Sequence, residues 1–233
     1  MTDRNQGLLF GLLGVIIFSG SLPATRAAVL GFDPLFLTAA RAVLAAATGA
    51  LPLLLFRQKR PDRADLLPLV VIAVSVVVGF PLLSALALTD MPSTRGILFT
   101  GLLPLATAMF GVVRGGERPR PIFWVFALAG AALVGGFALL NGGSGGGGRG
   151  DLLMLAAILV CGLGYAEGAA LSRRLGGWQV ICWALLVAAP VMAALGIWLW
   201  PAGTAPIGMG AWAGLFYVSL FSMLIGFVFW YRG

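Results

Sequence analysis

Two ionisable residues stand inside long apolar stretches of this sequence and are its main candidates for chemistry. Arg41 follows Pro34 by seven residues, and Glu167 follows Asp151 by sixteen. An ionisable group in a hydrocarbon layer costs about 2.5 to 3.5 kcal/mol on insertion scales, so each needs a partner or a role. At the rise of an α-helix these spacings correspond to depths of roughly 10 and 24 Å from the same side. A direct salt bridge between Arg41 and Glu167 is therefore not expected.

Glu167 has two interpretations. It is either a proton-coupling or cation-contacting carboxylate, or a structural group that reaches the nearer interface and pairs with Arg173 or Arg174. Gly164 and Gly168 flank it at GxxxG spacing. Because small residues let another backbone approach, this spacing predicts a tight helix contact under either interpretation.

Arg41 also has two interpretations, which the sequence leaves open. A guanidinium suits carboxylate and phosphate geometry, so Arg41 could bind an anionic group of a substrate. The alternative is a structural tie to backbone carbonyls or to Asp90.

The remaining site candidates are aromatic residues and prolines within the apolar stretches. Tyr165 and Trp183 could contact an apolar or aromatic substrate, although such side chains more often pack against lipid or neighbouring helices. Pro23, Pro81 and Pro104 would free backbone carbonyls, which often line a binding cavity, but proline is common in membrane helices in any case.

The sequence lacks the residues that several kinds of chemistry require. The chain has no histidine, and no Walker motif, dinucleotide fingerprint or metal-ligand cluster is visible in the sequence. We therefore expect no catalytic residue, no metal and no cofactor. An enzyme acting on lipids would need clustered polar residues at one membrane face, whereas this chain has isolated ones.

The elements that position these residues are predicted to be eight membrane-spanning helices. Of the 233 residues 60% are hydrophobic and 10% charged, and the mean hydropathy is +1.02. A bilayer core needs about 20 apolar residues of helix. The stretches that satisfy this requirement run approximately over 7–25, 34–56, 66–89, 93–113, 121–141, 151–172, 178–200 and 210–231. The fold class is therefore an all-α polytopic transmembrane bundle.

Basic residues alternate between the loops and predict the orientation of the chain. Eleven basic residues fall on the side of the N-terminus, and three, Arg26, Arg95 and Arg149, on the other. Lys and Arg are retained in the cytoplasm, so the N-terminus is expected there. The basic residues flank apolar spans without an aromatic platform, so the expected partner is a lipid bilayer and not nucleic acid.

A glycine-rich segment, 142–150, divides the chain into units 1–141 and 151–233. Ser75 to Phe80 matches Ser222 to Phe227 at an offset of 147, and Leu8 to Gly20 matches Leu152 to Gly164 at 144. A first unit of five helices would place the second upside down, as in the inverted repeats of secondary transporters. The second unit reaches Gly233 after three spans, giving a 5 + 3 arrangement.

These features resemble the drug/metabolite transporter superfamily, specifically its EamA-type ten-helix members. The likeness lies in Arg41, in Leu103-Pro104-Leu105, in Gly116-Glu117-Arg118-Pro119 and in Gly150-Asp151-Leu152-Leu153. The resemblance implies a bacterial inner-membrane exporter of small metabolites, amino acids or drug-like molecules that works by alternating access. The alternative is a truncated, non-transporting fragment, or a subunit that a homo-oligomer or another partner completes with two helices.

Overall fold

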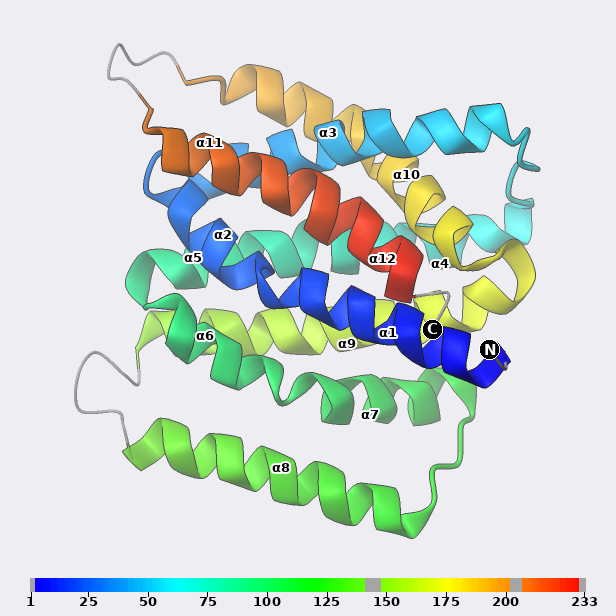
Figure 1. Cartoon of the computed structure of the whole chain (residues 1–233), viewed down its shortest axis with the longest axis vertical. Coiled ribbons are helices and arrows are strands. Elements are labelled where there is room, and N and C mark those ends of the chain that lie inside the picture. Colours follow the sequence, from blue (N-terminus) through cyan, green and yellow to red (C-terminus); the bar gives the residue numbers. More distant parts are fainter. Residues whose placement is uncertain (1–2, 141–147, 202–206, 231–233) are drawn as a thin grey trace.

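The computed structural model describes residues 3–140, 148–201 and 207–230, and every regular element in these ranges is a helix. The helices run side by side as a bundle (Figure 1). Seven of the eight predicted spans correspond to apolar helical stretches of 22 to 28 residues, and the remaining one is α8 (Pro121–Leu140), of 20 residues. The predicted all-α, multi-pass architecture is confirmed.

Besides α8, three spans are single helices: α3 (Pro34–Leu55), α9 (Arg149–Leu175) and α10 (Gly177–Trp198). Four spans are composite. The first is α1 (Asp3–Ser19) with α2 (Ser21–Val29), and the third is α4 (Arg63–Ile72), η1 (Ala73–Gly79) and α5 (Phe80–Asp90). The fourth is α6 (Ser93–Thr100) with α7 (Leu103–Gly115), and the last is α11 (Met209–Phe216), η2 (Tyr217–Ile225) and α12 (Gly226–Trp230).

Helix ends follow local sequence signals. Pro34 opens α3, and the Asp33 carboxylate accepts hydrogen bonds from the backbone amides of Leu35 and Phe36 at 2.8 and 3.2 Å. Gly116 and Gly176 follow α7 and α9 with φ of 63° and 89°, a region that favours glycine. The turns at the spans' ends are therefore encoded locally.

The bundle is organised around three close helix contacts. The α3 and α10 helices pack against each other through buried alanines and a few larger apolar residues, and α9 lies between α5 and α7. The α1–α2 span packs along α11, η2 and α12, whereas α8 lies at the edge beside α6 and α7 (Figure 1). Small residues at these contacts let helices approach where there is no hydrophobic force between them in lipid.

The charged loops separate to two ends of the bundle (Figure 1). We call the end at which α1 begins the basic end, because it carries the loops 57–63 and 114–120 and the turn at 173–174. The opposite end carries Asp33, Asp90, Arg95, Arg149 and Asp151. The alternation read from the sequence is thus present in the structure, while the assignment of the basic end to the cytoplasm stays a prediction.

Candidate functional site

The first span is interrupted near its middle, three residues before Pro23. The α1 helix ends at Ser19 and α2 begins at Ser21, with Gly20 between them. Proline lacks the amide hydrogen that would bond the carbonyl one turn earlier, so the helix tightens or breaks before it. The fourth span is interrupted in the same way at residues 101–102, directly before Pro104. Two of the three predicted prolines, Pro23 and Pro104, thus follow breaks and are exposed on the surface of the bundle, whereas Pro81 is buried in the first turn of α5, directly after η1.

The third and last spans carry wide, π-helical turns at matching places. The amide of Phe80 donates to the carbonyl of Ser75, and the amide of Gly226 donates to that of Phe221, each across five residues. Both segments belong to the sequence match at an offset of 147. π-Helical turns are rare and concentrate at functional sites. We call η1, η2 and the two proline-associated breaks the interrupted belt.

Polar side chains join the two halves of the chain across this belt. The hydroxyls of Ser21 and Ser222 lie 2.7 Å apart, and the Tyr217 hydroxyl donates to the carbonyl of Ile17 at 2.8 Å. Both contacts link η2 to the break in the first span. The tyrosine bond satisfies a backbone carbonyl of α1 beside the interruption, where a membrane interior offers no water as a partner.

Arg41 is buried next to this belt. Its Nη2 donates to the carbonyl of Val218, in η2, at 3.2 Å, and its Nε has no hydrogen-bond partner. The predicted tie to a backbone carbonyl is therefore confirmed. The predicted alternative partner was wrong, because the ion pair of Asp90 is with Arg149, at 3.9 Å. Within the described ranges no carboxylate lies within ion-pair distance of Arg41.

Glu167 is also buried, but it lies toward the basic end and pairs with an unexpected residue. Its Oε1 accepts a hydrogen bond from Nε of Arg114, in the last turn of α7, at 2.5 Å, and forms an ion pair with Nη2 at the same distance. The predicted pairing with Arg173 or Arg174 was wrong: these bind Glu117 at 3.6 Å and Asp65 at 2.6 Å, respectively. The α9 helix turns Glu167 toward α7, which the sequence of α9 alone could not reveal.

The predicted contact at Gly164 is present. A Cβ there would lie 2.5 Å from Val76 Cγ2 and 2.8 Å from Ser75 Cβ, so α9 and η1 approach as closely as glycine permits. Tyr165, the next residue, packs edge-on against Phe227 with ring centroids 5.9 Å apart. Tyr165 therefore lies within the packed interior of the bundle and not in one of the two pockets described below.

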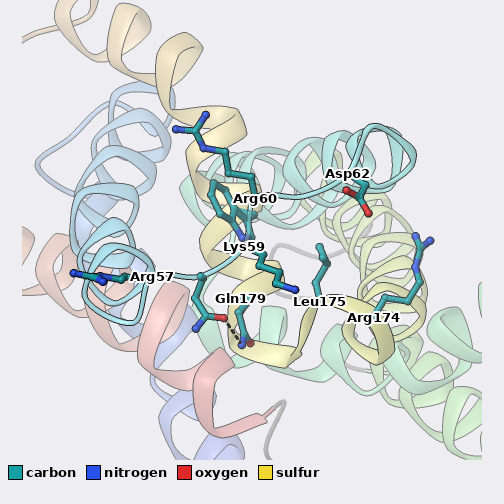
Figure 2. Close-up of a pocket in the computed structure, with 9 residues that line it drawn as sticks. Arg57, Lys59, Arg60, Asp62, Arg174, Leu175 and Gln179 are labelled. Atoms are coloured by element: carbon teal, nitrogen blue, oxygen red, sulfur yellow. Dashed lines mark hydrogen bonds between the residues drawn. The ribbon is translucent and has the colours of Figure 1, made fainter.

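Trp183 lies at a different place from the other candidates. It lines a pocket of about 450 Å³ at the basic end, together with residues of the 57–62 loop and the α9–α10 turn (Figure 2). We call this the basic pocket; its other lining residues are Arg57, Gln58, Lys59, Arg60, Asp62, Arg174, Leu175 and Gln179. A smaller apolar pocket of about 220 Å³ lies nearby, lined by Pro52, Phe56, Trp178, Cys182, Leu224, Ile225 and Val228.

The structure thus places Arg41 and Pro23 beside η2, which is part of the interrupted belt. Pro104 lies at another part of the belt, the break between α6 and α7. The structure places Glu167 and Trp183 toward the basic end. Sequence reasoning missed Arg114, Tyr217 and the serine pair. Ser222 was part of the internal match, which was the available signal; Arg114 looked like an ordinary loop cation.

The family model of the EamA-like transporter family matches residues 5–140, more than half of the chain. The chain belongs to the EamA-like transporter family. It is 60% identical over 233 residues to the Uncharacterized transporter YdeK of Bacillus subtilis (strain 168), covering 100% of this chain and 81% of that protein. Family and relative together identify a multi-pass membrane transporter.

A solved crystal structure has the same fold. It superposes with a TM-score of 0.67 at 22% identity and covers 98% of this chain and 79% of the other. At this identity the likeness concerns the fold alone. The helical arrangement described above is therefore one that an experimentally determined protein also adopts.

Proposed function

We propose that the protein is a secondary transporter that exports small metabolites, amino acids or drug-like molecules by alternating access. The observation that carries the proposal is the interrupted belt: four spans lose regular α-helical geometry, and in two of them this happens at matching positions. In secondary transporters, discontinuous helices near the membrane centre form the substrate site because their free backbone groups can bind a ligand.

Arg41 supports a substrate that bears an anionic group. A guanidinium taken out of water with only one carbonyl acceptor is poorly compensated, and its Nε is a buried donor without an acceptor. A substrate carboxylate that reaches Arg41 in another state of the transport cycle would satisfy this donor. Amino acids and acidic metabolites carry such a group.

The test begins with cells that express the protein and cells that do not, exposed to toxic amino acid analogues, nucleosides and drugs. A transported compound is expected to inhibit the two strains differently, and its efflux from preloaded expressing cells is then measured. If expression changes neither the growth inhibition nor the efflux of any compound across these classes, the proposed function is wrong.

Two substitutions, Arg41→Met and Arg41→Lys, test whether the guanidinium binds the substrate or only supports the fold. We expect Arg41→Met to slow efflux of carboxylate-bearing compounds by about tenfold or more, as for loss of a charge-assisted hydrogen bond, with Arg41→Lys in between. Arg118→Gln, an exposed cation of the 114–120 loop, is the matched control and should transport normally. An equal loss for neutral and anionic compounds would show that Arg41 only supports the fold.

A further inference from the structure

The basic pocket lies apart from the interrupted belt, at the end of the bundle where α3, α9 and α10 meet the adjoining loops. Four of its lining residues are cationic and one is anionic. Arg174 is partly neutralised by its 2.6 Å contact with Asp65. The pocket therefore keeps an excess of positive charge that the transport proposal does not use.

Lys59 is the cation best placed inside the pocket. Figure 2 shows its side chain extending toward Leu175 and the middle of the pocket, whereas Arg57 and Arg60 point outward. Within the described ranges Lys59 has no ion-pair partner. Its ammonium group is thus available to an anion that enters from the membrane surface.

The start of α10 adds to this positive charge. Gly176 precedes the helix and offers no side-chain acceptor to the first backbone amides. The N-terminus of a helix carries a partial positive charge and donors that point outward. Because Gln179, in the first turn of α10, lines the pocket, this end of the helix adjoins it.

Gln179 is held in a fixed position at the start of α10. Its amide nitrogen donates to Oε1 of Gln58 at 3.1 Å, and Nε2 of Gln58 donates in turn to the carbonyl of Phe56 at 3.2 Å (Figure 2). This chain of bonds fixes the orientation of the Gln179 amide. Its Oε1 is buried and lies against Gly176, where an added Cβ would be 2.4 Å away, so it is covered by the protein and does not face the pocket.

We propose that the basic pocket binds a phosphate ester. The phosphate would lie against Lys59 and the start of α10. The glycerol-phosphate headgroup of an anionic phospholipid has this chemistry, and so does free glycerol 3-phosphate. Basic pockets between membrane helices at a charged surface are suited to such headgroups.

Native mass spectrometry of the purified protein in detergent tests the proposal. The probes are phosphatidylglycerol, phosphatidylcholine and glycerol 3-phosphate, each titrated separately. We expect phosphatidylglycerol to bind more tightly than phosphatidylcholine. Lys59→Gln should weaken phosphatidylglycerol binding by about fivefold, the effect of one basic residue near an anionic surface. Gln179→Glu should weaken it further, because it places a carboxylate beside the phosphate.

Arg118→Gln is the control, because it removes an equal charge from the basic end without touching the pocket. Tight binding of glycerol 3-phosphate that Lys59→Gln weakens would support the site and identify a soluble ligand. Equal affinity for the two lipids, together with no binding of glycerol 3-phosphate, would overturn the proposal. So would an equal effect of Lys59→Gln and Arg118→Gln, since binding would then depend on overall charge alone. Lys59 lies in a loop, and circular dichroism checks that its variant is folded.

Discussion

Arg95 and Asp151 are joined by two parallel hydrogen bonds, from Nε to Oδ1 and from Nη2 to Oδ2, each 2.7 Å long. Their side chains are only 13% and 18% exposed. Asp151 also lies in the first turn of α9, where the helix dipole favours an anion. This pair joins the fourth span to α9 at the opposite end, and Arg114 with Glu167 joins the same two elements toward the basic end.

The first prediction concerns this pair. Replacing Arg95 with Gln should destabilise the protein by about 1 to 3 kcal/mol, because the mostly buried carboxylate of Asp151 loses its bidentate partner. Thermal unfolding in detergent measures the change. Arg149→Gln is the control, since its 3.9 Å contact with Asp90 is largely exposed and should contribute little. Similar melting temperatures for the two variants would contradict the prediction.

The second prediction concerns Arg114 and Glu167. If their contact is a structural tie, Arg114→Gln and Glu167→Gln should each lower the melting temperature, and the double variant should be little worse than Glu167→Gln alone. The Glu167 side chain is 10% exposed and that of Arg114 is 50% exposed, so leaving Glu167 unpaired should be the more damaging change. Additive losses in the double variant would show that the two residues act independently.

The coupling interpretation of Glu167 makes a separate prediction. For a substrate identified by the efflux screen, Glu167→Gln should abolish the dependence of vesicle uptake on a pH gradient if this carboxylate carries the coupled proton. Arg114→Gln should leave some dependence, because it retains the carboxylate. A fully preserved pH dependence in folded Glu167→Gln protein would remove the coupling role and leave the structural one.

The spans and their breaks could be predicted because their causes are local. Hydropathy over about 20 residues reports the cost of exposing polar groups to lipid, and it found every span. Pro23 and Pro104 follow breaks, but Pro52 and Pro190 lie inside continuous helices, so proline indicates a break without requiring one. The π-helical turns themselves could not be predicted. Both, however, overlap the two segments that match each other at an offset of 147.

The ion pairs could not be predicted, because they depend on how two helices are aligned. Glu167 lies on the same helix as Arg173 and Arg174, and helical spacing alone therefore suggested those partners. The packing of α9 against α7 decides otherwise. Gly162 lets the helices approach, since a Cβ there would lie 2.8 Å from that of Ala106, and this contact brings Arg114 within reach. Arg95 was likewise counted as a loop residue, because the sequence does not show that α6 packs against the start of α9.

A fourth prediction concerns orientation. A reporter fused after Arg60, at the basic end, and one fused after Met91, at the opposite end, should report different compartments, with the Arg60 fusion in the cytoplasm. The charge excess at the basic end is the physical reason. Substituting Lys59, Arg60 and Arg63 together with Gln should reduce this preference more than substituting Arg26 does. Both fusions in one compartment would contradict the helical order of the structure.

The fifth prediction concerns Gly20, in the break of the first span. Its backbone angles suit any residue, but an added Cβ would lie 2.4 Å from Oη of Tyr217. Gly20→Ala should therefore destabilise the protein by about 1 to 3 kcal/mol, because overpacking would displace the tyrosine that caps the carbonyl of Ile17. Gly135→Ala is the matched control: it lies in α8 with open space around it and should be neutral or slightly stabilising. Combining Gly20→Ala with Tyr217→Val should relieve the clash, so the second change should cost less in the Gly20→Ala background than alone. Equal costs in the two backgrounds, measured by thermal unfolding, would show that the two positions do not interact.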